Sequence, residues 1–321
     1  MRQIEIANPD TLYGVLSMFS SQKWTNKAIL NDSKIRDLIE HLSKRKLGNK
    51  DYPADLMGDA YEILLKKFAD DSKAQAGEFY TPRSVVRLLV HILDPQPGET
   101  VYDPACGSGG MLIEAIRYMH DDSLCCGSIF GQEKNVVNAA IAKMNLFLHG
   151  ASDFNVMQGD TLRDPKILQG GNIAKFDCVI ANPPFSLENW GATEWSSDKY
   201  KRNIYGTPSD SCGDYAWIQH MICSMSSGKG RMAVVMPQGI LFRGNQEAEI
   251  RKQLVESDLI ESVVTLGDKL FYGTGLSPCF LIIRRMKQAH HSGRILMIDG
   301  SKILTQKRAQ NILEENDIDR L

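Results

Sequence analysis

Asn182, Pro183, Pro184 and Phe185 form the short segment of this chain whose residue types most directly suggest chemistry. The segment follows Phe176–Ala181, a run that reads as a buried strand. Both prolines lack a backbone N–H and have a fixed φ, so the strand must end there. The Asn182 side-chain oxygen and the Pro183 carbonyl then offer hydrogen-bond acceptors beside an aromatic ring. That combination suits a flat group carrying an amine; the simpler interpretation is a Pro-Pro turn after a buried strand.

A glycine-rich turn, Pro104–Gly110, lies upstream between a strand-like run at Thr100–Asp103 and an expected helix at Gly110–His120. Such turns let the backbone approach a ligand closely. On this feature alone a nicotinamide-binding fold would be the first alternative. However, the turn lacks GxGxxG spacing and opens on the carboxylate of Asp103, which would repel a pyrophosphate. It therefore favours a ligand with a positive charge, and the simpler role for Asp103 is a helix cap.

Three motifs follow one another along the chain: Gly77–Arg83, Asp103–Gly110 and Asn182–Phe185. Their order and spacing resemble the S-adenosylmethionine-dependent N6-adenine DNA methyltransferases and, more narrowly, the modification (M) subunits of type I restriction–modification systems. The resemblance extends from about Asp55 to the end of the chain, with Phe271–Gly275 also similar. It implies an adenine-specific DNA methyltransferase that uses S-adenosyl-L-methionine, acts on double-stranded DNA and produces N6-methyladenine.

The resemblance also implies which residues hold the cofactor. In this family the glycine-rich turn wraps the methionine half of S-adenosylmethionine, and the candidates there are Asp103, Ala105, Gly107, Ser108, Gly109 and Gly110. Glu133 ends the next expected strand and can accept both ribose hydroxyls; its alternative is a surface ion pair with Lys134. Asp160 and Thr161 follow the strand after that, at a position similar to the family's adenine contact, although Gly-Asp-Thr is also an ordinary turn.

A third group of cofactor candidates precedes the first strand and comprises Glu78, Phe79, Tyr80, Thr81, Pro82 and Arg83. Its aromatic pair can form a wall of the pocket, and the N-terminus of the following helix favours the methionine carboxylate. Thr81 and Pro82 also predict where that helix begins, with a hydroxyl cap followed by proline in the first turn. The simpler role of the aromatic pair is a hydrophobic staple at the helix start.

The Asn-Pro-Pro-Phe segment predicts how the methyl group would be transferred. The adenine amine is a poor nucleophile because its lone pair is delocalised into the ring. Acceptors at Asn182 and Pro183 would hold the amine hydrogens and localise the lone pair, while Phe185 stacks on a base turned out of the helix. Positioning and electrostatics would then supply most of the acceleration, with no covalent intermediate and no metal. The candidate catalytic residues are therefore Asn182, Pro183, Pro184 and Phe185.

Two other residues of catalytic type are interpreted as structural. Pro278 and Cys279 form the Pro-Cys pair that cytosine C5 methyltransferases use, but they begin an apolar run that reads as a strand. Cys279 is therefore expected in the core. His220 lies on an apolar helical face and has no triad pattern around it.

The expected elements after Glu99 alternate between strands and helices. The strands are Thr100–Asp103, Ser128–Gln132, Asn155–Gln158, Phe176–Ala181, Met232–Met236, Ile260–Leu266 and Cys279–Arg284, and the helices include Gly110–His120, Val136–Leu148, Tyr215–Ser224 and Gln246–Val255. The alternation predicts an α/β fold of parallel βαβ units, a doubly wound Rossmann-like methyltransferase sheet. Ligands bind at the carboxyl ends of such strands, where Asp103, Glu133, Asp160 and Asn182 all fall.

The chain is expected to divide into a small helical N-terminal region, residues 1–75, and a methyltransferase domain, residues 76–321. Apolar residues at helical spacing support the first part, namely Ile35, Leu38, Ile39 and Leu42, then Leu56, Ala60, Ile63, Leu64 and Phe68. Ser186–Cys212 has little periodicity and interleaves aromatic with basic residues: Trp190, Trp195, Lys199, Tyr200, Lys201, Arg202 and Tyr205. That pattern fits stacking and phosphate contact with DNA or, equally, a flap that packs on its own rings.

Composition bounds the class of protein and its partners. The chain has 321 residues, is 43% hydrophobic and carries a net charge of −2, which is ordinary for a globular protein but not for one that grips DNA alone. Its 7 cysteines include no CxxC pair, which suggests reduced thiols in a cytoplasmic protein. No apolar run is long enough to span a membrane. The resemblance implies a specificity and a restriction subunit as partners, with two modification subunits per specificity subunit.

Two other classes of function stay open. An Asn-Pro-Pro-aromatic segment also occurs in methyltransferases of RNA bases and of protein glutamine, although the helical N-terminal region and Phe79–Pro82 favour DNA. A non-enzymatic scaffold is opposed by the presence of Asp103, Asn182 and Phe185. The chain is short at both ends for a modification subunit, so a fragment whose activity needs other parts is also considered.

Overall fold

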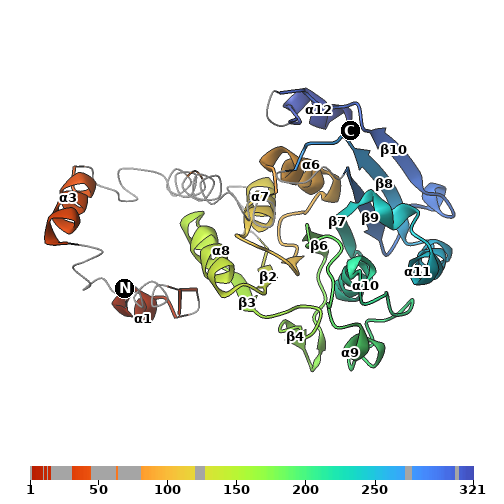
Figure 1. Cartoon of the computed structure of the whole chain (residues 1–321), viewed down its shortest axis with the longest axis horizontal. Helices are drawn as coiled ribbons and strands as arrows, with labels where there is room; N and C mark the ends of the chain where they lie inside the picture. Colours follow the sequence, from red (N-terminus) through yellow and green to blue (C-terminus); the bar gives the residue numbers. More distant parts are fainter. Residues whose placement is uncertain are drawn as a thin grey trace.

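The computed structural model describes residues 2–9, 11–12, 14–15, 31–44, 63, 81–119, 127–271, 277–307 and 311–321. Its centre is an 8-stranded sheet with the order β10-β8-β9-β7-β6-β1-β2-β3 (Figure 1). The strands are β1 (Val101–Asp103), β2 (Ile129–Glu133), β3 (Phe154–Gln158), β6 (Cys178–Ala181), β7 (Arg231–Pro237), β8 (Ile260–Leu266), β9 (Pro278–Arg284) and β10 (Leu296–Gly300). A separate small sheet pairs β4 (Leu168–Gln169) with β5 (Asn172–Ile173).

The strand directions agree with the predicted sheet except at one strand. β3, β2, β1, β6 and β7 run parallel to one another, and β10 runs parallel to β8. β9 is antiparallel to both β7 and β8, so the expectation of parallel units throughout was wrong there. The connection from β8 to β9, residues 267–277, is shorter than the crossover of about a dozen residues that a parallel pair needs, so the chain turns back.

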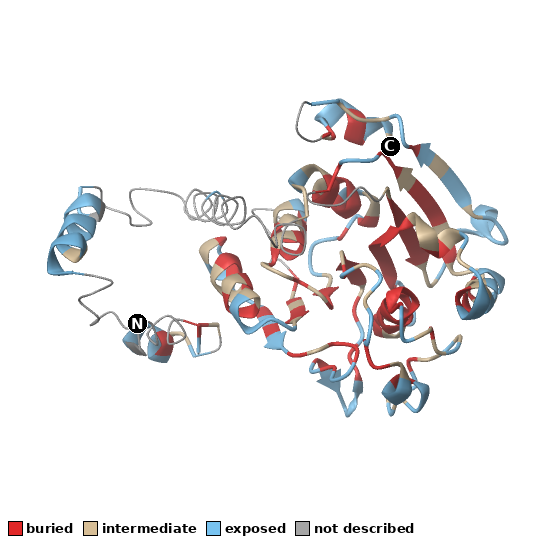
Figure 2. Ribbon diagram, in the orientation of Figure 1, coloured by how far each residue is buried: buried red, intermediate tan, exposed pale blue. Residues whose placement is uncertain are grey.

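Helices cover both faces of the sheet. One face carries α6 (Arg83–Leu93), α7 (Gly110–Met119), α8 (Val136–Leu148) and α12 (Glu315–Arg320), and the other carries α10 (Asp214–Ser224) and α11 (Asn245–Glu256). The shorter elements are α9 (Ala192–Ser196), η1 (Gln238–Leu241) and η2 (Ala289–His291). Figure 2 shows the buried residues concentrated in the strands and on the helix sides that face them. This is the doubly wound α/β arrangement that the alternation predicted.

Helix α6 shows how local sequence positions the future site. Its buried side chains recur at helical spacing and comprise Val85, Val86, Leu88, Leu89, Val90 and Leu93; each such burial is worth about 1.5–3 kcal/mol. The Pro82 carbonyl accepts the Val85 and Val86 N–H groups at 2.9 and 3.0 Å, while no side chain caps the helix. The predicted hydroxyl cap was therefore wrong, because Pro82 rather than Thr81 is the N-cap residue, and the Thr81 oxygen accepts a hydrogen bond from Asn182.

The described N-terminal elements are α1 (Arg2–Ala7) and α3 (Asp32–Leu42), which lie to one side of the sheet in Figure 1. The Asn31 side chain caps α3 by accepting the Lys34 N–H at 2.9 Å. The predicted helix around Leu56–Phe68 lies outside the described residues apart from Ile63. The boundary at 75/76 also falls outside them, so the division of the chain stays a prediction. Within the described ranges, every helix is too short or too polar to cross a membrane.

Candidate active site

The four predicted polar residues lie at one edge of the sheet. Asp103 ends β1 and Glu133 ends β2, while Asn182 directly follows β6 and Asp160 lies two residues after β3. These strands are neighbours in the order β6-β1-β2-β3 and run parallel. Their carboxyl ends therefore meet at the same edge, as predicted for a doubly wound sheet.

The turn between β1 and α7 is fixed by contacts with the protein at some residues and is open at others. Asp103 Oδ1 accepts the Ala105 N–H at 2.9 Å. Gly107 and Gly109 have φ of 53° and 84°, in the left-handed region that favours glycine. Gly109 also lies close to α8, since a Cβ there would be 3.4 Å from the Ala142 Cβ, whereas a Cβ on Gly107 would meet nothing within 4 Å. The turn thus packs against the protein at Gly109 and is open at Gly107.

Asp103 is a buried acid at the start of this turn, only 2% exposed. Burial raises the pKa of its carboxyl to about 8, and the nearby Glu133 carboxylate adds to the shift. A buried carboxyl of this kind favours a cationic ligand group, because a positive charge stabilises its ionised form. The residues present therefore fit the ammonium of S-adenosylmethionine.

Glu133 joins the ends of β1 and β2. Its Oε2 accepts the Gly107 N–H at 2.9 Å and its Oε1 accepts the Asn135 N–H at 2.7 Å. Each carboxylate oxygen has a further lone pair with which to accept a hydroxyl. Lys134 pairs with Asp160 over 2.9 Å, so the alternative ion pair between Lys134 and Glu133 is not formed.

Asp160 and Thr161 follow β3 and differ in what they offer a ligand. Asp160 is partly exposed; its Oδ1 accepts the Arg163 N–H at 3.2 Å. Thr161 is 2% exposed, and its hydroxyl donates to the Pro104 carbonyl at 2.6 Å. Thr161 therefore connects the segment after β3 to the glycine-rich turn, and its side chain stabilises that turn.

Asn182 occupies the end of β6 with its two amide atoms in different surroundings. Its Nδ2 donates to the Thr81 hydroxyl oxygen at 2.8 Å. Its Oδ1 is buried and has no hydrogen-bond partner in the described part of the chain. An unpartnered buried acceptor costs about 1–3 kcal/mol, so it is expected to receive a donor from a ligand. The geometry offers the acceptor that the sequence predicted.

The rest of the Asn-Pro-Pro-Phe segment lies beside that oxygen. Pro183 is buried, Pro184 is exposed and Phe185 is half-buried. The Phe185 ring lies 6.4 Å from the Phe271 ring, with an angle of 58° between their planes. Phe185 thus rests against the core on one side. Its role in stacking on a base stays a prediction.

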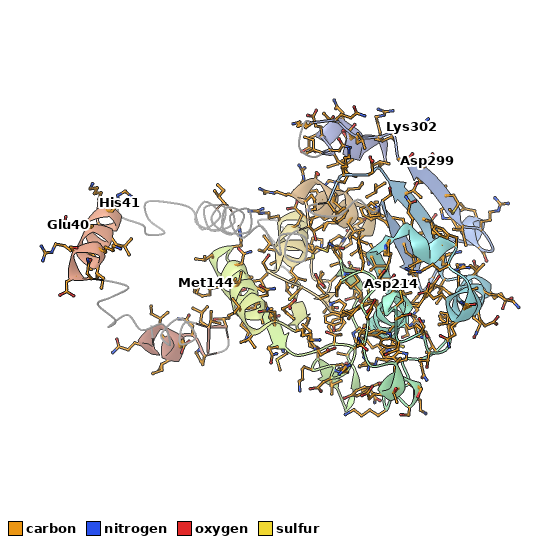
Figure 3. All side chains as sticks on the ribbon, in the orientation of Figure 1. Glu40, His41, Met144, Asp214, Asp299 and Lys302 are labelled. Atoms are coloured by element: carbon orange, nitrogen blue, oxygen red, sulfur yellow. The ribbon has the colours of Figure 1, made fainter. Side chains whose placement is uncertain are left out.

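A hydrogen-bond and ion-pair network that was not predicted holds the chain immediately after this segment. The Ser186 N–H donates to Asp214 Oδ1 at 2.7 Å, and Asp214 also pairs with Arg243. Asp214 is 1% exposed and begins α10, where Figure 3 labels it within the body of the protein. In the sequence, the only sign of this network is an aspartate directly before the expected helix Tyr215–Ser224. Such an acid is also common at a helix N-terminus without any further partner.

Comparison with known proteins fits this geometry. Residues 52–321 match the model of the N-6 DNA methylase family. The chain belongs to that family. The type I restriction enzyme MjaVII methylase subunit of Methanocaldococcus jannaschii is 37% identical over 298 residues, which are 89% of this chain and 50% of that protein. The resemblance to type I modification subunits is thereby confirmed, and the chain spans about half the length of the curated relatives it matches.

Solved structures agree with the fold. A type I restriction-modification system methyltransferase subunit from Streptococcus thermophilus matches with a TM-score of 0.80 at 30% identity, covering 90% of this chain and 61% of that one. A Listeria monocytogenes protein assigned to the class I S-adenosylmethionine-dependent methyltransferases has a TM-score of 0.63 at 16% identity, covering 91% and 84%. At that identity the second match bears on the fold alone. The predicted methyltransferase sheet is confirmed.

The segment after the Asn-Pro-Pro-Phe motif packs on its own rings. Trp190 and Trp195 are each 2% exposed and Arg202 is 1% exposed. Arg202 lies 4.3 Å from the Trp195 ring and pairs with Asp198 at 2.8 Å. The flap interpretation of Ser186–Cys212 is therefore confirmed for these side chains. Lys199 and Lys201 are exposed and stay available for phosphate contact.

The two residues interpreted as structural are confirmed in that role. Cys279 is fully buried in β9, and burial raises the pKa of its thiol to about 12, which disfavours the thiolate. His220 is 1% exposed, and it lies 3.2 Å from the Tyr102 hydroxyl and 3.2 Å from Arg202 Nη1. Burial and the Arg202 charge lower the pKa of His220, so the imidazole is neutral.

Several of the predicted site residues lie outside the described part of the chain. Glu78, Phe79 and Tyr80 lie outside the described residues, as does 272–276, which includes most of the segment Phe271–Gly275. Thr81, Pro82 and Arg83 are described and lie at the start of α6. Of these three, Thr81 is the residue that the structure brings to Asn182.

Proposed function

We propose that this chain transfers a methyl group from S-adenosylmethionine to the N6 amine of adenine in DNA, as the modification part of a type I restriction–modification system. The observation that carries the proposal is the buried, unpartnered Oδ1 of Asn182 beside Pro183 and Phe185. Among the described residues no donor reaches that oxygen, so a ligand that supplies one would satisfy it. The adenine amine is such a donor, and it belongs to a flat ring that suits Phe185.

The residues at the sheet edge would divide the work between cofactor and base. Asp103 would hold the ammonium group, the Gly107–Gly110 turn would lie against the methionine half, and Glu133 would accept the ribose hydroxyls. Asp160 would accept from the cofactor's adenine. When bound, S-adenosylmethionine supplies an electrophilic methyl group on a sulfonium. The family and the fold support this assignment.

The remaining cofactor assignments follow the same family resemblance. We assign to cofactor binding the residues before β1 and those around the turn, namely Glu78, Phe79, Tyr80, Thr81, Pro82, Arg83, Ala105, Ser108 and Thr161. The placement of Thr161, whose hydroxyl is bonded to Pro104, favours support of the turn over direct contact through that side chain.

Asn182 and its neighbours would prepare the amine for attack. Oδ1 of Asn182 and the carbonyl of Pro183 would each accept one N6 hydrogen, which localises the nitrogen lone pair. Phe185 would stack on the base, which must leave the helix to reach this depth. The bound cofactor would supply the methyl group to N6, and N6 would release one proton to water. Fixed acceptors in a partly buried site supply the acceleration by positioning and electrostatics.

DNA recognition would depend on a partner. A net charge of −2 provides little of the counterion release that drives DNA affinity. The relatives are named as methylase subunits of type I restriction enzymes. We therefore propose that two copies of this chain assemble with one specificity subunit. A restriction subunit would join them in the full enzyme.

A competition between DNA, RNA and protein substrates tests the substrate class. The purified chain, with and without a specificity subunit, is incubated with tritiated S-adenosylmethionine and equal amounts of DNA, RNA and protein. We expect label in DNA, recovered as N6-methyladenine, and only when the specificity subunit is present. Label in RNA or in glutamine would support the alternative substrates instead. Absence of label from all three, with cofactor bound, would identify a scaffold.

The proposed assembly has its own test. Mobility shift of the isolated chain on duplex DNA should show weak binding that is independent of sequence. Light scattering of the chain mixed with the specificity subunit should give the mass of two copies around one partner. Tight, sequence-specific modification by the chain alone would contradict the type I assignment and indicate a solitary methyltransferase.

A further inference from the structure

The Asn182 amide nitrogen donates a hydrogen bond to the Thr81 hydroxyl oxygen over 2.8 Å, although the residues are 101 positions apart in the chain. Thr81 directly precedes Pro82, the N-cap residue of α6, and no side chain caps this helix. The hydroxyl therefore serves Asn182 rather than its own helix. This contact joins the segment before β1 to the end of β6.

The orientation of the Asn182 amide decides whether the site can hold an amine. An asparagine amide has nearly the same shape when turned by about 180°, which exchanges its NH2 donor with its carbonyl acceptor. In the observed orientation the acceptor Oδ1 is buried and has no hydrogen-bond partner among the described residues. In the reversed orientation an NH2 group would meet the substrate's NH2 group, and both would lack acceptors. Only the observed orientation is productive.

A hydroxyl selects this orientation only under one condition. Because it both donates and accepts, a threonine hydroxyl could donate to a reversed Asn182 oxygen as readily as it accepts from the nitrogen. If its single hydrogen is donated elsewhere, it can only accept, and the amide must then present its nitrogen. Thr81 lies at the N-terminal end of α6, where a carboxylate is favoured by the helix dipole.

We propose that Thr81 is a positioning residue that couples the cofactor to the orientation of Asn182. Donating its hydrogen to the carboxylate of bound S-adenosylmethionine leaves its oxygen as an acceptor alone, which fixes Asn182 with Oδ1 toward the substrate adenine. The inference rests on the proposed function. It adds that the bound cofactor strengthens recognition of the adenine amine through this hydroxyl, a coupling that acts equally in both directions.

The coupling is measured by binding, without turnover, on the complex with the specificity subunit. Target duplexes carry either adenine or purine, which lacks the amine, at the methylated position. In the wild type, S-adenosylhomocysteine should tighten the adenine duplex over the purine duplex by about ten-fold, within the usual range of coupling between sites. Thr81→Val should remove this preference, and Thr81→Ser should restore it. Ser84→Ala, at the second residue of α6, is the matched control and should behave as the wild type.

Kinetics separate positioning from simple cofactor contact. At saturating cofactor, single-turnover methyl transfer by Thr81→Val should fall about ten- to a hundred-fold, as expected when a group that orients a key dipole is lost. Its affinity for S-adenosylhomocysteine, measured by calorimetry, should fall about ten-fold because the hydrogen bond to the cofactor carboxylate is lost, and saturating cofactor should not restore the rate. Thr81→Ala repeats the measurement if the valine variant unfolds, which circular dichroism checks.

Three results would overturn the inference and one would overturn its premise. An unchanged amine preference in Thr81→Val would show that the hydroxyl does not orient Asn182. A rate fully restored by more cofactor would leave Thr81 as a cofactor contact only. Failure of Thr81→Ser to recover would indicate that the methyl group, not the hydroxyl, matters. A wild type that methylates no adenine would instead remove the proposed function itself.

Discussion

The Arg202 guanidinium donates to the Thr161 carbonyl at 2.9 Å and thereby joins the segment after the Asn-Pro-Pro-Phe motif to the cofactor side of the sheet edge. The Thr161 hydroxyl in turn donates to the Pro104 carbonyl at 2.6 Å. A buried arginine thus supports the glycine-rich turn through one intermediate residue. The substrate side and the cofactor side of the site share this support.

Replacing Arg202 is therefore expected to destabilise the fold and loosen the turn. Arg202→Met leaves the buried Asp198 carboxylate unpaired, and breaking a buried pair in this way costs about 3–5 kcal/mol. Urea unfolding at pH 7.5 measures the loss, with the exposed neighbour Lys201→Met as control. The double variant Asp198→Asn, Arg202→Met should recover part of the stability, because the unpaired charge is gone. Unfolding of Arg202→Met at the wild-type urea concentration would contradict this account.

Cofactor binding near neutral pH is expected to release a proton from Asp103. The pKa of this carboxyl is raised to about 8 by burial, so at pH 7 it is mostly protonated. The ammonium of S-adenosylmethionine favours the ionised form and lowers that pKa, so the proton leaves on binding. Calorimetry at pH 7 in phosphate and in Tris gives the number released from the difference in heat. Asp103→Asn should release fewer protons and bind more weakly; equal release by both proteins would place the proton elsewhere.

Glu133 is expected to act on cofactor affinity and little on chemistry. The two carboxylate oxygens of Glu133 accept the Gly107 and Asn135 N–H groups. In Glu133→Gln one of these oxygens becomes an NH2 group, which cannot accept a hydrogen bond. Losing a hydrogen bond to a charged group costs about 1.5–3 kcal/mol, which corresponds to about ten- to a hundred-fold in affinity. Calorimetry should show that loss, while the single-turnover rate at saturating cofactor stays near that of the wild type. The exposed Glu256→Gln serves as control, and an unchanged affinity in Glu133→Gln would remove its assignment.

His220 is expected to make the fold sensitive to acid. Burial and the Arg202 charge lower the pKa of His220 below its ordinary value of about 6.5, so the unfolded chain binds a proton that the folded chain does not. Stability from this group is complete above about pH 6.5 and falls as the pH drops below it, by up to about 1.4 kcal/mol per pH unit. Urea midpoints from pH 7.5 to 5 should fall less steeply for His220→Gln. Identical slopes would show that His220 does not titrate between the two states.

The sequence was sufficient for most of the sheet and for the edge where the site lies. Runs of strand length predicted β1, β2, β3, β6, β7, β8 and β9 near their positions. The signal was clearest for β6, β7 and β9, which are almost entirely buried and therefore read as continuous apolar segments. It was not sufficient for β10, whose Leu296 and Met297 are 59% and 62% exposed, since an exposed edge strand has no such pattern. The direction of β9 depended on the length of its connection, not on its own residues.

The residues of the site were predictable by type, but their contacts were not. Asn182 was identified because prolines end its strand and free its side chain. Its bond to Thr81 joins segments far apart in the chain, and local propensity favoured a helix cap for that hydroxyl instead. The burial of Arg202 was equally hidden, since its acceptors at Thr161 and Leu162 come from another loop. Tertiary contacts decided these cases.

The central claim is that Asn182 holds the substrate amine and takes little part in cofactor binding. Asn182→Ala in the complex with the specificity subunit tests it most directly, with the exposed Asn155→Ala as matched control. The measurement pairs S-adenosylhomocysteine affinity by calorimetry with N6-methyladenine formation in a target duplex. The account predicts affinity within about three-fold of the wild type (about 0.7 kcal/mol) and no detectable N6-methyladenine. Cofactor affinity that collapses together with activity, or methylation that persists, would contradict it.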